Sequence, residues 1–130
     1  MRYLIVLVVG LLAGALLASF ALGALQQRHA WPRAVMTTMR HAFAATRPAL
    51  QAQTCNVAAL ARSHALLSLL ARDIEPAVLG AGEDRAFSRY AADFRATLAQ
   101  WDPAAPCSSQ TEAVQKVDQA CDACHRDYHG

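Results

Sequence analysis

The hydropathy pattern begins with an apolar block that differs from the rest of the chain. After Met1-Arg2, the run from Tyr3 to Leu25 contains no charged or amide side chain. As a helix it would extend roughly 34 Å, enough to cross the hydrocarbon core of a bilayer. Ala21-Leu22-Gly23 has the small–x–small pattern of a signal-peptidase site. Residues 1–25 are therefore predicted to be a signal peptide or a membrane anchor, and both alternatives place the following residues outside the cytoplasm.

Residues 26–130 divide into four stretches in which apolar side chains recur every three or four positions, as on one face of a helix. The first is predicted to run from Trp31 to Ala45, with Pro32 suited to a first helical turn. Pro48 disfavours helical backbone at the residue before it, so we expect this helix to end by Arg47.

The second predicted helix starts at Thr54 or Asn56, since both residues are suitable N-caps. It continues to Ile74, and Glu75-Pro76 is expected to end or bend it. The glycines of the following segment, LGAGED, predict a loop.

The third predicted helix begins near Glu83-Asp84, because acidic residues favour a helix N-terminus. It carries the clearest apolar stripe in the chain, formed by Phe87, Tyr90, Ala91, Phe94, Leu98 and Trp101. The fourth has capping-box spacing at Ser109 and Glu112 and ends by Gly130. Four helices joined by short loops predict an all-α fold, an antiparallel (up-down-up-down) four-helix bundle, for residues 26–130.

Charge adds little to this picture. The chain has 12 Lys and Arg residues against 10 Asp and Glu, and Arg2 is one of the basic residues. Such a near-neutral balance gives no argument for nucleic acid or for an acidic partner. Few β-branched residues and many alanines follow the apolar block, which favours helix over strand.

The chain closes on the sequence CDACHRDYHG, in which Cys121, Cys124 and His125 have the spacing that attaches c-type haem. Two thiols on one helical turn can each add to a vinyl group of the porphyrin, and the next residue supplies an axial imidazole. Three other interpretations remain open: a redox pair, a disulfide within the motif, and a zinc site with His129 as fourth ligand. The redox pair would need a β-α-β setting that the pattern lacks.

This motif on the last helix of an exported helical chain resembles the class II cytochromes c, the cytochrome c prime family. The resemblance covers residues 27–130 and is most specific at CDACHRDY. The stretch RAVMTTMRHAF also resembles the segment of that family that faces the sixth iron position. The resemblance implies Met36 as candidate sixth ligand, with Arg33 and Met39 nearby. His129 stands where the family usually has a basic residue, and Arg126 is the nearest arginine.

The predicted topology brings the start of the first helix and the end of the fourth to one end of the bundle. There, the end of the second helix and the start of the third should close the haem pocket. The expected lining residues are Leu70, Ile74, Phe87, Tyr90 and Ala91. Trp31 and Trp101 are interpreted as core or pocket wall, and His64 as a core histidine with a hydrogen-bond partner.

Cys55 and Cys107 remain outside the motif. Both are predicted to lie at the bundle end opposite the haem, on the two loops that meet there. An exported protein reaches an oxidising compartment, so we expect a Cys55–Cys107 disulfide, with two free buried thiols as the alternative.

These features predict an exported, non-enzymatic c-type cytochrome with one covalent haem. It would carry electrons between periplasmic or membrane redox partners, either soluble after signal cleavage or anchored in the inner membrane by residues 3–25. A five-coordinate iron that binds nitric oxide or carbon monoxide, for scavenging or sensing, is the second interpretation. Members of the family often dimerise, so a homodimer is a further candidate state.

Overall fold

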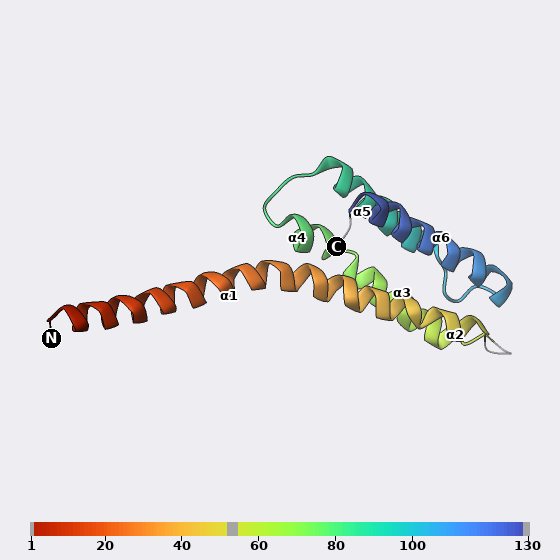
Figure 1. Ribbon diagram of the computed structural model, residues 1–130. Helices are drawn as coiled ribbons and strands as arrows, with labels where there is room; N and C mark the ends of the chain where they lie inside the picture. The colour runs from red at the N-terminus through yellow and green to blue at the C-terminus, as the bar shows by residue number, and fades with distance from the viewer. Residues whose placement is uncertain (1, 52–54, 129–130) are drawn as a thin grey trace. The chain divides into compact units, whose positions relative to one another are not determined.

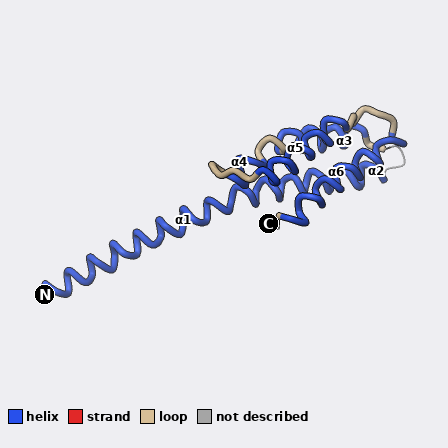
Figure 2. Tube along the Cα trace, turned by 90° about the horizontal axis from the view of Figure 1, so that it is seen from above, coloured by secondary structure: helices blue, strands red, loops and turns tan. Residues whose placement is uncertain are grey.

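The computed structural model of the protein describes residues 2–51 and 55–128. Across these residues the chain is all-helical, with six helices and no strand (Figures 1 and 2). It divides into two compact units, one up to Trp31 and the other from Pro32 onward. The all-α class that the sequence predicts is confirmed.

The first unit is the apolar part of helix α1, Arg2–Ala44. Its segment Val6–Ala24 is long and apolar enough to cross a membrane, and none of that span is buried in protein. Two expectations were wrong here. Pro32 lies inside α1 rather than in a first turn, because the apolar residues before it are already helical. Trp31, expected to belong to the core or the pocket wall, is 53% exposed.

The second unit begins with the remainder of α1 and the short helix α2, Thr46–Gln51. The helix breaks at Ala45, close to the expected end, but Pro48 does not stop the chain from resuming helical structure. Pro48 is the third residue of α2, where a backbone N–H would have no intrahelical partner, so its missing donor costs little.

Helix α3, Val57–Leu70, starts as predicted: the Asn56 side chain accepts a hydrogen bond from the Ala59 amide at 3.0 Å. Thr54, the alternative N-cap, lies outside the described residues. The helix ends four residues before Ile74, which was the predicted end. A tight turn follows, in which Arg72 and Asp73 donate to carbonyls only three residues back. Ile74 instead begins helix α4, Ile74–Leu79.

Helix α5, Arg85–Gln100, is capped by Asp84, whose Oδ1 accepts from the Ala86 and Phe87 amides at 2.9 and 3.0 Å. Helix α6, Cys107–Asp127, starts two residues before the predicted capping box. Ser109 therefore lies inside the first turn, and its hydroxyl donates to the Pro106 carbonyl instead of capping.

Helices α5 and α6 form the most extensive packing of the second unit, and they run antiparallel. At one end, Trp101 donates to Gln110; at the other, Tyr128 donates to Asp84. Helix α2 packs against α3 and α6, while α3 and α4 pack against α5.

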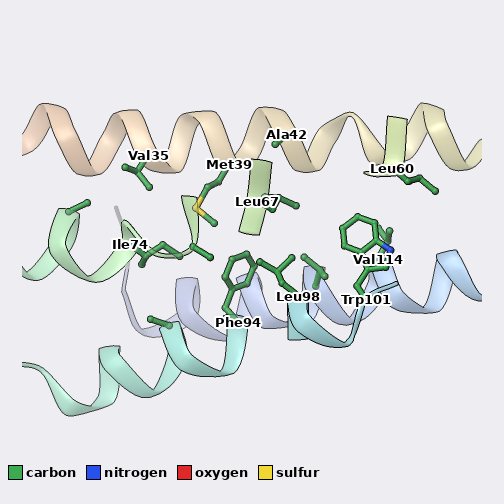
Figure 3. Close-up of a cluster of buried hydrophobic side chains, with 14 of the residues drawn as sticks. Val35, Met39, Ala42, Leu60, Leu67, Ile74, Phe94, Leu98, Trp101 and Val114 are labelled. Carbon is green, nitrogen blue, oxygen red and sulfur yellow. The ribbon is translucent and has the colours of Figure 1, made fainter. Parts of the chain in front are cut away.

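The buried side chains of all these helices form one apolar core (Figure 3). Met39 points from α1 toward Phe94 of α5, and Val35 lies on the same face as Met39, one turn earlier. The stripe predicted for α5 is confirmed, with its positions from Phe87 to Trp101 buried except for Tyr90, which is half-buried.

Candidate functional site

The predicted motif occupies the last two turns of α6. Cys121 and Cys124 are both free thiols, both half-buried and both packed against the core. His125, the next residue, is exposed, and it lies one helical turn after Cys121 on the same side of α6. The last two turns of α6 thus carry two thiols packed against the core and one solvent-exposed imidazole.

Both thiols are held in their neutral form. Burial, followed by the Asp118 and Asp122 carboxylates, raises the pKa of Cys121 to about 12. Burial and the Asp127 carboxylate raise the pKa of Cys124 as well. Neither group is therefore activated as a thiolate in the way that a catalytic redox cysteine is.

Three aromatic rings gather where the end of α6 meets the start of α5. The Phe87 ring packs edge-on against that of Tyr128, with centroids 5.1 Å apart, and Tyr90 lies 6.1 Å from Tyr128 in a similar geometry. Phe87 is buried, whereas Tyr90 and Tyr128 are half-buried. The structure therefore brings Phe87 and Tyr90, two of the predicted pocket residues, to the helix end that carries Cys124.

Two hydrogen bonds join the same two helix ends. The Tyr128 hydroxyl donates to Asp84 Oδ2 at 2.8 Å, and the Tyr90 hydroxyl donates to Asp127. Each bond raises the pKa of the tyrosine that donates it, that of Tyr128 to about 12. The pKa of Asp84 is lowered by the Phe87 amide and then by Tyr128.

The residues predicted from helix α1 differ in their environment. Met39 is buried in the core, with 8% of its surface exposed, whereas Met36 is half-buried and packs against the edge of that core. Arg33 is exposed. Of the pocket residues predicted from the second helix, Leu70 is half-buried and Ile74 is buried, and both contact the same core.

The opposite end of α6 holds the predicted disulfide. Cys55 and Cys107 are bonded, with their Cα atoms 5.8 Å apart, so the alternative of two free thiols is wrong. His64 also has a partner, as predicted: its Nε2 lies 3.0 Å from the Leu98 carbonyl oxygen, within donating distance. It packs edge-on against Trp101.

Metal-ligating side chains and surface hollows are the other features that could form a site. The part of the chain that the structure describes contains no group of three or more His, Cys, Asp or Glu side chains able to hold a metal ion. His129, the fourth zinc ligand considered above, lies outside the described residues. Among the described residues, one shallow hollow is lined by Trp101 and Lys116 and another by Glu75 and Ser88, and neither includes a residue of the motif.

Sequence reasoning did not assign a role to Tyr128 or Asp127. One signal was present: Asp127 places a negative charge in the last turn of a helix, where the helix dipole disfavours it. Such a local conflict points to a tertiary partner, which the structure identifies as Tyr90.

Comparison with models of protein families, with curated proteins and with solved structures finds no match.

Proposed function

We propose that this protein is an exported c-type cytochrome of the class II type, which carries one covalent haem and transfers electrons. One observation supports it above all others. Cys121, Cys124 and His125 have the spacing of haem attachment, and both thiols are free and face an apolar core.

The donor set fits the group. Cys121 and Cys124 would hold the porphyrin, with each S–H adding across one vinyl group so that the proton moves to carbon and nothing leaves. His125 would supply the axial imidazole, and its exposure leaves both ring nitrogens accessible. When bound, haem supplies a reversible one-electron couple at iron.

The surrounding side chains suit electron transfer better than acid–base chemistry. Phe87, Phe94 and Ile74 are buried apolar residues of the core against which both cysteines pack, and they would shield a haem bound there from water. A low local polarity favours the less charged redox state, and Met36 as sixth ligand would raise the potential further. Arg33, Met39, Leu70 and Tyr90 complete the proposed surroundings.

The finer architecture belongs to the same proposal. An antiparallel bundle would have four helical segments. These would be the part of α1 after Pro32 together with α2, then α3 together with α4, then α5, and then α6. The antiparallel pairing of α5 with α6 supports this arrangement. Residues 1–25 would direct export as signal or anchor, and redox proteins of the periplasm or membrane would be the partners.

The test of the proposal is covalent haem. Wild type produced with a haem-attachment system should show a haem-stained band on a denaturing gel, and Cys121→Ala/Cys124→Ala should not. Cys55→Ser/Cys107→Ser is the matched control, because it also removes two cysteines but should keep the stain. Haem retained by the first variant would refute the proposal.

A second measurement separates electron transfer from gas binding. The apolar side chains of Val35 and Met39 beside Met36 would also suit a five-coordinate iron that binds nitric oxide or carbon monoxide. If Met36 is the sixth ligand, wild type is low-spin by EPR and Met36→Leu is high-spin. Met39→Leu is the control, since Met39 should only pack. A high-spin wild type would favour the gas-binding alternative.

A further inference from the structure

The end of α6 needs more support than its own helix provides. The last four carbonyls of a helix have no intrahelical partner. Cys124 and His125 lie in this last turn. Within residues 55–128, one backbone bond closes this turn beyond the helix, from the Tyr128 amide to the Cys124 carbonyl at 2.9 Å.

Side chains of α5 supply the missing support from outside the helix. Tyr128, directly after α6, has extended backbone, and its hydroxyl reaches Asp84 at the start of α5. Asp84 serves two purposes at once, because Oδ1 caps α5 while Oδ2 accepts from Tyr128. The Phe87 ring packs on Tyr128 from the same first turn of α5.

A second hydrogen bond between the same two helix ends has its donor on α5 and its acceptor on α6. Tyr90 of α5 donates to Asp127 of α6, so each helix contributes one tyrosine and one aspartate. Asp127 is unfavourable at a helix C-terminus on local grounds, and its pairing with Tyr90 offsets that cost. Both bonds join the last turn of α6 to the start of α5, and together they restrain that turn against unwinding.

We propose that the pairs Tyr128–Asp84 and Tyr90–Asp127 are positioning residues for haem attachment. They hold the turn of Cys124 and His125 in helical geometry before the porphyrin arrives. The inference rests on the proposed function, because it gives these bonds a role only if haem binds at that turn. It gives this role to four residues, all of them outside the attachment motif Cys121–His125, that set the direction of the axial imidazole.

Hydrogen exchange on the haem-free chain tests the positioning directly. Tyr128→Phe and Tyr90→Phe each remove one hydroxyl and leave the ring. Each should speed exchange of the amides from Cys124 to Tyr128 by about fivefold, and the double variant by more, while Val114 and Val117 keep their protection. Arg95→Gln is the control, because it breaks the Arg95–Glu75 ion pair, which joins α4 to α5 without touching α6.

Two substitutions of Asp84 distinguish its hydrogen bond to Tyr128 from its role as the N-cap of α5. Asp84→Asn can still cap α5 and form a hydrogen bond with the Tyr128 hydroxyl. In this variant, exchange of the amides from Cys124 to Tyr128 should therefore match wild type. Asp84→Ser keeps a capping oxygen but is too short to reach Tyr128, so it should behave like Tyr128→Phe. Equal exchange in all variants, or acceleration spread evenly along α6, would overturn the inference.

The haem-loaded protein provides a spectroscopic readout. Loss of both hydroxyls should lower haem incorporation several-fold and broaden the EPR signal, since the His125 imidazole would adopt a range of orientations. Arg95→Gln should change neither. If the double variant incorporated haem fully and gave an EPR signal as sharp as that of wild type, the inference would be overturned while the proposed function stands. A wild type without haem would refute the proposed function and with it this role.

Discussion

At the scale of single residues, the most demanding hydrogen-bond requirement in the core is that of Gln110. Its side chain is fully buried, with 0% exposed, and it accepts from the Trp101 indole N–H at 2.7 Å. Its amide nitrogen donates to the Asp102 and Ala105 carbonyls at 2.9 and 2.8 Å. One glutamine therefore satisfies three groups of the loop that joins α5 to α6, and a buried polar group without a partner is costly.

We expect Gln110→Leu to lower the free energy of unfolding by about 2–3 kcal/mol, because Trp101 and two carbonyls lose their partners. Denaturant unfolding followed by circular dichroism measures this. Gln115→Leu, on the exposed face of α6, is the matched control and should change stability by less than about 0.5 kcal/mol. Equal effects of the two variants would contradict the assigned network.

The thiols of the motif give a second prediction at this scale. Because burial raises the pKa of Cys121 to about 12, little thiolate exists at pH 8. After correction for the higher nucleophilicity of a more basic thiolate, Cys121 should alkylate about 30-fold more slowly than an ordinary cysteine. Cys124→Ala isolates Cys121 in the haem-free chain, and its rate in denaturant is the reference.

The rate in the folded chain should rise as pH increases toward 12, since only the thiolate reacts. Similar rates in folded and denatured chain at pH 8 would contradict the burial of Cys121.

At the scale of elements, α6 is restrained at both ends. Its first residue, Cys107, is bonded to Cys55 just before α3, and its last turn is tied to α5 by the two tyrosine–aspartate bonds. The helix that carries the motif is therefore fixed to α3 at one end and to α5 at the other.

Removal of the disulfide should destabilise the fold without removing the motif. The two cysteines are 52 residues apart, and the chain-entropy model gives about 4 kcal/mol for a loop of that length. We expect Cys55→Ser/Cys107→Ser to lose about 2–4 kcal/mol in denaturant unfolding. Reduction of wild type should give a similar loss, and a stability unchanged by reduction would contradict a structural disulfide.

At the scale of the whole molecule, the chain separates into two units of different composition. The first contains the apolar span Val6–Ala24, and the second contains the core, the disulfide and the motif. The composition of the first unit suits a membrane or an export machinery, whereas the second buries its own apolar faces.

We expect deletion of residues 1–25 to abolish haem attachment, because the chain would stay in the cytoplasm. An unrelated cleavable signal peptide placed before residue 26 should restore it. Haem staining of periplasmic and cytoplasmic fractions measures both. Covalent haem on the cytoplasmic chain would contradict the predicted route.

Much of the fold could be predicted from local pattern. The stripe of α5, the caps at Asn56 and Asp84 and the all-helical class follow from side-chain spacing and capping chemistry, which act within a few residues. The ends of helices were less predictable. Leu70, Ile74 and Cys107 became boundaries because turns and packing compete with helix propensity at those points.

The candidate site also has parts that local sequence predicts and parts that it does not. The sequence by itself determined the motif of Cys121, Cys124 and His125 and the apolar leader, because both are contiguous in the chain. Topology argued from the sequence also predicted the Cys55–Cys107 pair. Only the tertiary structure decided that Tyr128 bonds Asp84, that Tyr90 bonds Asp127 and that Met39 is buried more deeply than Met36. Such contacts join residues more than thirty positions apart, and they depend on how helices pack rather than on local spacing.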